Sequence, residues 1–336
     1  MNKIRISPSQ TDATGLLDKD VYEHYYERSI TPSARPAKIG PVIKGFDVGV
    51  LRAGDIYPSY PRFDLAEGIT ETIYDFHGYY VRKYEKEGIE GLHRTIFTFH
   101  GGSFTMGSME RLNNVYMRLA QLADAVVIAV DYTLSPEAAF PVSAIQCYDA
   151  IQKVIERKEE FHCDPDKIIT WGDSAGGQLV LNCSLQDRIN KIIKMQILYY
   201  PVTDLSEYSN EVFDIDRFGT VTDLMLSKIY QTGKAATAEM ARAYIQDEHA
   251  DLKDPMISPL FTEDMSVFPR TVLVTAQYDF LSQQSEELAD KLDKAGVKVD
   301  HIEFLGNFHG FVERLGFFES SDKSLQMIAD LIKKEI

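Results

Sequence analysis

Cysteine is scarce in this chain of 336 residues, which contains only Cys147, Cys163 and Cys183. Three is an odd number, and no two of these cysteines form a CxxC pair. A disulfide framework or a zinc site built on cysteine is therefore not expected, and a reducing compartment fits the pattern.

Long apolar runs are also missing. The longest, such as Ala125–Val130, are far shorter than the roughly 20 residues that a membrane-spanning helix needs. The first residues, MNKIRISPSQTD, contain no apolar h-region of the kind found in secretory signals. We therefore expect a cytoplasmic protein without a membrane-bound segment.

Basic residues are in the minority, with 35 Lys and Arg against 51 Asp and Glu, a net charge of −16. A field of this sign repels phosphate backbones and anionic lipid, so neither a nucleic acid nor a membrane is an expected partner. The charge balance predicts solubility rather than fold. The charge balance does not decide the oligomeric state, so both a monomer and a homodimer remain possible.

Strand-like and helix-like segments alternate from about Thr70 onward. The strand-like segments are apolar without period-two alternation, which indicates strands buried on both faces of a mostly parallel sheet. The predicted strands are residues 95–99, 125–130, 167–171, 192–199, 271–276 and 297–304. The predicted helices are residues 112–122, 144–155, 175–185, 283–295 and 323–334.

Two segments do not show this alternation of strands and helices. Residues 1–55 carry three prolines and a glycine between positions 31 and 41, which favours short helices and loops over strands. Residues 204–256 form a charged, aromatic, helix-like insertion between two strands, and an insertion of this length usually serves a function. We expect both segments to lie apart from the sheet.

The sequence Gly172-Asp173-Ser174-Ala175-Gly176 follows a predicted strand and opens a predicted helix. This is the context of a nucleophile elbow, in which a serine projects above the carboxyl edge of a sheet. The turn is so tight that Gly172 and Gly176 must be small. The alternative is an ordinary glycine-rich turn with an N-capping serine.

A second glycine-rich turn, His100-Gly101-Gly102-Ser103-Phe104, follows an earlier predicted strand. Acyl transfer develops negative charge on a carbonyl oxygen, and backbone N–H donors must already point at it. Glycines allow the backbone to approach that closely. The alternative is a plain turn after a strand.

A serine nucleophile needs a base, which in this chain order should follow the serine. His249 lies in the insertion, and His301 lies inside a predicted strand with mixed neighbours, where we expect it to be exposed or at a sheet edge. His309 lies in a loop directly after that strand and is the predicted base.

The acid that orients the base should end a strand before His309. Asp279 meets this condition, because it stands three residues after the strand TVLVTA. Asp264 is a weaker rival in a loop before a strand. The other carboxylates in this region fall on a helix or strand and are expected to face solvent; they are Asp290, Asp293 and Asp300.

Taken together, these motifs resemble the hormone-sensitive-lipase-like branch of the α/β-hydrolases, which includes bacterial acetyl esterases. The resemblance covers residues 95–313 and rests on HGGSF, VDYTLSPEAAFP, GDSAGG, YYPVTD, SPL and FHGF, in that order. It implies an α/β-hydrolase fold with a mostly parallel, eight-stranded sheet flanked by helices. It also implies a helical cap made of residues 1–55 and 204–256, with residues 56–336 as the catalytic domain.

The resemblance further implies hydrolysis of small carboxylic esters without a metal or organic cofactor. Carried over by position, the oxyanion donors are the amides of Gly102, Ser103 and Ala175, while His100 and Gly101 shape their loop. The elbow is supported by Gly172, Asp173 and Gly176. Two positions depart from the family pattern: Ser103 replaces a third glycine, and Gln283 replaces a second acid.

Other functions remain open at this point. An amidase or peptidase would use the same triad chemistry. The gibberellin receptors show that a ligand-binding protein can use this scaffold after losing the histidine, whereas Ser174, Asp279 and His309 are all present here. Aromatic residues of the two cap segments would either attach the cap to the sheet or close a short acyl pocket; they include Tyr22, Tyr25, Tyr26, Phe46, Phe213 and Phe218.

Overall fold

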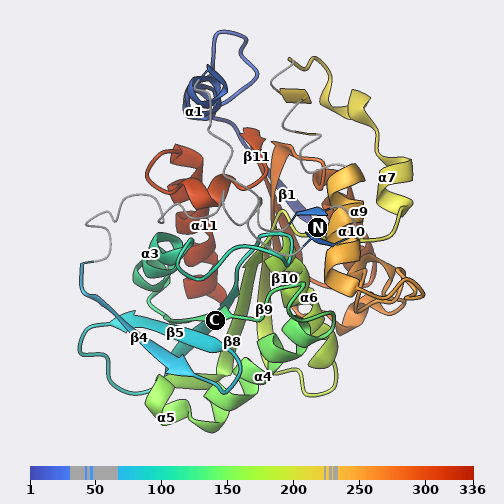
Figure 1. The fold of residues 1–336 in the computed structure, drawn as a ribbon. Helices are drawn as coiled ribbons and strands as arrows, with labels where there is room; N and C mark the ends of the chain where they lie inside the picture. The colour runs from blue at the N-terminus through green and yellow to red at the C-terminus, as the bar shows by residue number, and fades with distance from the viewer. Residues whose placement is uncertain (31–41, 44–45, 48–66, 223–224, 227–228, 230–233) are drawn as a thin grey trace.

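A large, twisted sheet runs through the centre of the molecule in the computed structural model, with helices on both of its faces (Figure 1). The structure describes residues 1–30, 42–43, 46–47, 67–222, 225–226, 229 and 234–336. Within them the sheet has nine strands in the order β1-β11-β10-β9-β8-β6-β7-β5-β4. Neighbouring strands are parallel except at one end, where β5 is antiparallel to both β7 and β4.

The strands that are buried in the middle of the sheet carry the apolar runs, as expected for strands covered on both faces. The sheet consists of β1 (Asn2–Ile6), β4 (Ile69–Asp75), β5 (Tyr80–Lys86), β6 (His93–Phe99), β7 (Val126–Asp131), β8 (Cys163–Asp173), β9 (Ile193–Tyr199), β10 (Arg270–Tyr278) and β11 (Val299–Phe308). A separate short pair is formed by β2 (Val42–Ile43) and β3 (Phe46–Asp47).

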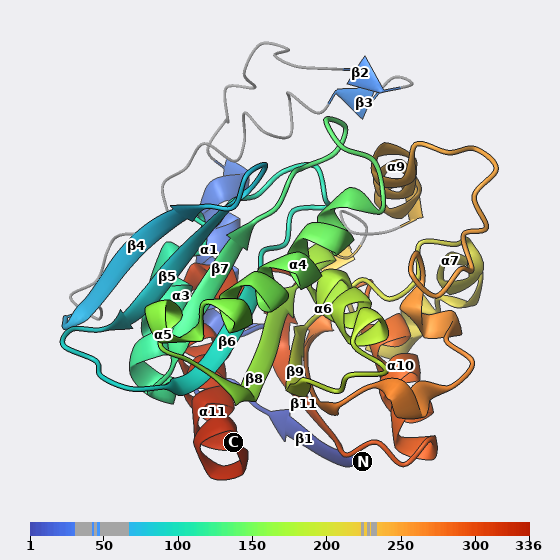
Figure 2. The same ribbon diagram turned by 90° about the horizontal axis from the view of Figure 1, so that it is seen from below.

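Helices cover both faces of the sheet: α3 and α11 lie side by side on one face, and α4, α6 and α10 lie on the other (Figures 1 and 2). The helices are α1 (Lys19–Ile30), α3 (Asn113–Ala123), α4 (Val142–Glu156), α5 (Lys158–Phe161), α6 (Ala175–Gln186), α7 (Tyr208–Val212), α9 (Lys234–Ile245), α10 (Ser282–Lys294) and α11 (Glu319–Glu335). Short 3-10 turns are η2 (Ile215–Phe218), η3 (Pro259–Phe261), η4 (Met265–Val267) and η5 (Phe311–Arg314).

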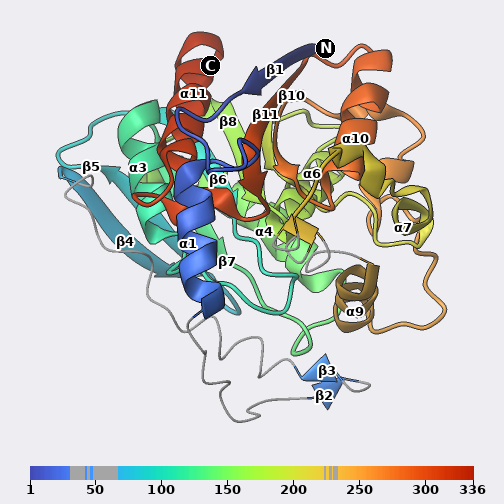
Figure 3. The ribbon, with the colours of Figure 1, turned by 90° about the horizontal axis from the view of Figure 1, so that it is seen from above.

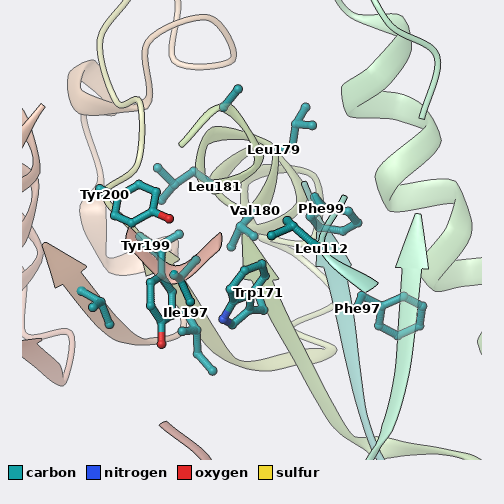
Figure 4. Close-up of a cluster of buried hydrophobic side chains, with 14 of the residues drawn as sticks. Phe97, Phe99, Leu112, Trp171, Leu179, Val180, Leu181, Ile197, Tyr199 and Tyr200 are labelled. Atoms are coloured by element: carbon teal, nitrogen blue, oxygen red, sulfur yellow. The ribbon is translucent and has the colours of Figure 1, made fainter. Parts of the chain in front are cut away.

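The core is built around aromatic side chains from neighbouring central strands (Figure 4). Trp171 of β8 and Tyr199 of β9 are both fully buried, with ring centroids 5.2 Å apart. Tyr116 of α3 meets the Trp171 ring edge-on at 5.9 Å. Such pairs contribute about 0.5–1.5 kcal/mol each beyond their buried area, so these rings stabilise the packing near the carboxyl ends of β8 and β9.

The predicted α/β-hydrolase fold is confirmed, but its strand count is wrong by one. The ninth strand is β1, which adds parallel to the outer edge of β11. The expectation that residues 1–55 lie apart from the sheet is therefore wrong for Asn2–Ile6. Two ion pairs accompany this pairing: Arg5 Nε donates to Glu303 Oε2 of β11 at 2.7 Å, and Lys3 Nζ donates to Glu286 Oε1 of α10 at 3.1 Å.

The added strand also overturns two expectations about exposure. His301 lies near the amino end of β11 and is fully buried, and β11 is not an edge strand, because β10 and β1 flank it. Asp300 is buried rather than solvent-facing: it accepts a hydrogen bond from Asn2 Nδ2 at 2.9 Å and pairs with Arg270. Asp290 and Asp293 are exposed, as predicted.

The predicted cap segments are described only in part. Figure 3 draws α1, from the first of these segments, across the middle of the view, and α9, from the second, near its lower right. The rest of the N-terminal segment, residues 31–41, 44–45 and 48–55, lies outside the described residues. The two-part cap therefore stays a prediction. Among the described helices, none has both the length and the apolar character to cross a membrane.

Candidate active site

Strand register brings the predicted site residues to one edge of the sheet. Phe99 of β6 lies opposite Gly172 of β8, so the turns that follow these two strands are neighbours. Tyr278 of β10 lies opposite Phe308 of β11, so the next residues, Asp279 and His309, are neighbours as well. The carboxyl ends of parallel strands form the usual ligand-binding edge of an α/β sheet.

The turn around Ser174 has the geometry of a nucleophile elbow. Ser174 has φ +54° and ψ −119°, a strained backbone conformation for a residue with a side chain. A Cβ on Gly172 would lie 2.3 Å from the carbonyl oxygen of Gly176, and a Cβ on Gly176 would lie 1.9 Å from that of Phe99. Both glycines are therefore required by close backbone approach, as the sequence predicts.

Ser174, His309 and Asp279 form a continuous chain of hydrogen bonds. The Ser174 hydroxyl donates to His309 Nε2 at 3.0 Å, and His309 Nδ1 donates to Asp279 Oδ2 at 2.7 Å. Asp279 is fully buried, and its other oxygen accepts from the amide of Leu281 at 2.9 Å. This arrangement fixes the imidazole tautomer that can accept a proton from serine.

The electrostatic surroundings favour a charged imidazole at this position. Burial lowers the pKa of His309, but Asp279, through its charge and hydrogen bond, raises it, with smaller contributions from Glu313 and Asp173. The net result is a pKa above the ordinary value of 6.5. The ring of Tyr200 lies 4.7 Å from the imidazole and closes its other side.

The turn after β6 presents backbone N–H donors beside the hydrogen-bonded Ser174, His309 and Asp279. Gly102 has φ +118°, and Ser103, which stands in the position of the family's third glycine, adopts φ +55°. The hydrogen bonds between described residues leave the amides of Gly102, Ser103 and Ala175 without an acceptor. Ala175 also begins α6, whose N-terminal dipole favours negative charge.

The loop is held by the predicted supporting residues. The amide of Gly101 donates to Asp173 Oδ1 at 2.8 Å. His100 stacks on Tyr132 with ring centroids 4.4 Å apart, and the Tyr132 hydroxyl donates to the His100 carbonyl at 2.7 Å. Burial, reinforced by the charge of Glu313, raises the pKa of Asp173 well above its ordinary range.

The rival residues lie elsewhere. His249 is exposed, and Asp264 uses its carboxylate to accept from the amide of Ser266 at 3.0 Å. Gln283, which replaces the family's second acid, holds the insertion: its Nε2 donates to the Val212 carbonyl at 2.7 Å, and its Oε1 accepts from the Asp214 amide at 3.1 Å.

The insertion's aromatics pack beside the acid of the site. Phe213 lies 4.4 Å from Phe280 and Phe218 lies 5.9 Å from Tyr278, measured between ring centroids. These contacts attach the insertion to the segment that carries Asp279. The side chains of Tyr25, Tyr26 and Phe46 lie outside the described residues, so the acyl pocket stays a prediction.

Sequence reasoning missed two charged residues next to the site. Glu313 follows His309 by four residues, its side chain is only 12% exposed, and it pairs with Arg111 from the segment after the oxyanion loop. A carboxylate inside the largely apolar stretch FHGFVERLGFF was the available signal. Its partner could not be found without the fold.

No group of three or more His, Cys, Asp or Glu side chains suited to hold a metal ion occurs within the described residues. The expectation of a site that needs neither metal nor organic cofactor stays a prediction.

The comparisons with known proteins concern the sequence and the fold. A sequence model of the alpha/beta hydrolase fold matches residues 96–313, more than half of the chain. The arylesterase of Saccharolobus solfataricus is 35% identical over 236 residues, which span 69% of this chain and 72% of the relative. The ethyl acetate hydrolase of Pseudomonas putida is 28% identical over 239 residues, spanning 70% and 71%.

A solved structure shares almost the whole architecture. The esterase of Pyrobaculum calidifontis in its monoclinic form superimposes with a TM-score of 0.77 at 26% identity. The match covers 95% of this chain and 98% of that chain.

Proposed function

Because the chain belongs to the alpha/beta hydrolase fold family and is a carboxylic ester hydrolase, we propose that it cleaves short-chain acyl esters through a triad of Ser174, His309 and Asp279. The observation that carries the proposal is the hydrogen-bond chain of 3.0 and 2.7 Å that joins these three side chains.

The reaction proceeds in two halves. Ser174 Oγ attacks the ester carbonyl while its proton moves to His309 Nε2, and the carbonyl oxygen becomes negative. The amides of Gly102, Ser103 and Ala175 stabilise that oxyanion. The C–O bond to the alcohol then breaks, and the alcohol leaves with the proton from His309.

The second half releases the acyl group. Water attacks the acyl-enzyme carbonyl and gives its proton to His309, and Ser174 leaves as the alkoxide that takes the proton back. Asp279 stabilises the imidazolium in both halves, because its carboxylate stays ionised beside Nδ1–H. The products are a carboxylic acid and an alcohol.

Two features support short acyl groups. The Pseudomonas putida relative is named for ethyl acetate, an ester of the smallest common acyl group. Phe213 and Phe218 fill space beside the Asp279 segment with bulky rings. A pocket of fixed depth gains about 0.8 kcal/mol per buried methylene until it is full, after which longer chains clash.

The test is a series of p-nitrophenyl esters with purified protein and the Ser174→Ala variant. We expect kcat/KM to be greatest between acetate and hexanoate, to fall sharply by dodecanoate, and to be unaffected by EDTA. Anilide substrates of matched acyl groups test the amidase alternative. A steady rise toward long chains would contradict the short-chain proposal, and full turnover by Ser174→Ala would contradict the triad.

A further inference from the structure

One ion pair joins the segment that follows the oxyanion loop to the segment that follows His309. Arg111 lies between the oxyanion loop and α3, and Glu313 lies in η5. Arg111 Nη2 donates to Glu313 Oε2 at 2.5 Å, although the two residues are 202 positions apart. Arg314 adds a longer contact of 3.5 Å to the same oxygen. The Glu313 side chain is only 12% exposed, so this pair is largely protected from water.

Glu313 carries a negative charge in this setting. Burial alone would raise its pKa, but Arg111 and Arg314 lower it more, and the net pKa is below the ordinary value. The charge reaches both loops, because Glu313 raises the pKa of His309 and of Asp173. Asp173 in turn holds the oxyanion loop through the Gly101 amide.

We propose that Arg111 and Glu313 are positioning residues, whose ion pair fixes the His309 loop against the segment that follows the oxyanion loop. The inference rests on the proposed function. Neither side chain reacts with the substrate in this account. Their effect is to hold the proton acceptor, His309, and the oxyanion donors in one fixed arrangement. A displacement of about 1 Å from such an arrangement can lower the rate as much as 100-fold.

A second ion pair provides a matched control. Arg118 of α3 donates to Asp322 of α11, with Nε–Oδ1 at 2.8 Å and Nη2–Oδ2 at 3.3 Å. It joins the continuations of the same two segments, but Asp322 is 45% exposed and neither residue contacts the site. Loss of this pair reports what a purely structural link between α3 and α11 is worth.

The experiment measures kcat, KM and the pH profile of kcat/KM for Glu313→Gln, Arg111→Gln, the double variant and Asp322→Asn. We expect each single site variant to lose about tenfold in kcat with KM changed less than about twofold. The double variant should lose no more than either single one, because both remove the same link. Asp322→Asn should keep the wild-type kcat.

The pH profile separates positioning from plain stabilisation. Without the Glu313 charge the pKa of His309 falls, so the acid limb of kcat/KM in Glu313→Gln should move to lower pH. If Glu313→Gln does not fold, Arg111→Lys tests the positioning role by itself. This variant keeps the Glu313 carboxylate, so kcat should fall while the acid limb of kcat/KM stays at the wild-type pH.

Independent, additive losses from the two substitutions, or equal losses from Asp322→Asn, would overturn the proposal. So would an unmoved acid limb in a folded Glu313→Gln protein. Failure of the proposed function would look different, because wild-type protein would then show no turnover that depends on Ser174.

Discussion

Two histidines on one strand show how strongly local surroundings decide chemistry. His301 lies near the amino end of β11, and His309 directly follows its carboxyl end. Burial lowers the pKa of His301 to about 4, whereas His309 has a pKa above its ordinary value. His301 faces a neutral hydroxyl, Thr275 Oγ1, at 2.8 Å, and His309 faces the Asp279 carboxylate at 2.7 Å.

The comparison teaches that a buried histidine without a carboxylate in contact stays neutral; at His301 burial lowers the pKa most, and the charges of Lys3 and Arg217 lower it further. A buried imidazole loses its hydration and stays neutral unless an anion compensates. Among the described residues no carboxylate is in hydrogen-bond contact with His301, whereas Asp279, which directly follows β10, contacts His309. The same residue type is thereby a packing element at one position and a candidate base eight residues later.

The largest expected effect separates the two histidines by activity. His309→Ala should lower kcat by a factor on the order of 10⁴, since it removes the base. His301→Gln should keep kcat within a few-fold of wild type, because its amide can still contact Thr275. Equal losses in the two variants, measured at equal folded fraction, would remove the distinction.

A somewhat smaller effect is expected when His309 loses its anion. Asp279→Asn should reduce kcat by about 10³- to 10⁴-fold, because an amide no longer fixes the reactive tautomer or stabilises the imidazolium. In wild type the rate should rise with pH through a midpoint above 6.5, where His309 becomes neutral. In the residual activity of Asp279→Asn this midpoint should move down, and an upward move would contradict the electrostatic account.

The sequence predicts much of this arrangement and misses part of it for physical reasons. Glycine spacing around Ser174 and the strand before Asp279 are local signals, so they can be read directly. The internal position of β11, which carries His301, depends on β1, which joins it from the far end of the chain. The Arg111–Glu313 pair likewise links distant positions. Contacts of this kind depend on topology, which residue patterns do not encode locally.

A third effect concerns stability rather than rate. The folded protein holds His301 neutral down to about pH 4, whereas an unfolded chain protonates it near 6.5. Above about pH 6.5 His301 therefore does not lower the free energy of unfolding. As pH falls from about 6.5 toward 4, the free energy of unfolding decreases by about 3 kcal/mol in total through this group. Urea unfolding across this range should show a weaker pH dependence in His301→Gln, and an identical slope would show that His301 is not held neutral.

The smallest effect is expected at Ser103, where neither histidine is involved. Its φ of +55° is costly for serine and easy for glycine, so Ser103→Gly should change stability by less than about 1 kcal/mol. Its backbone amide remains, and kcat should stay within about threefold. Loss of activity comparable to His309→Ala would show that the hydroxyl, and not the amide, acts on the substrate.

The most direct measurement of the central claim is covalent labelling with a p-nitrophenyl phosphonate ester, followed by peptide mass mapping. The reagent leaves a phosphonyl group on a serine that is activated by a neighbouring base. We predict one adduct per chain, on Ser174, in wild type and in His301→Gln, and labelling at least 100-fold slower in His309→Ala. An adduct on another residue, or wild-type labelling of Ser174 in His309→Ala, would contradict the account.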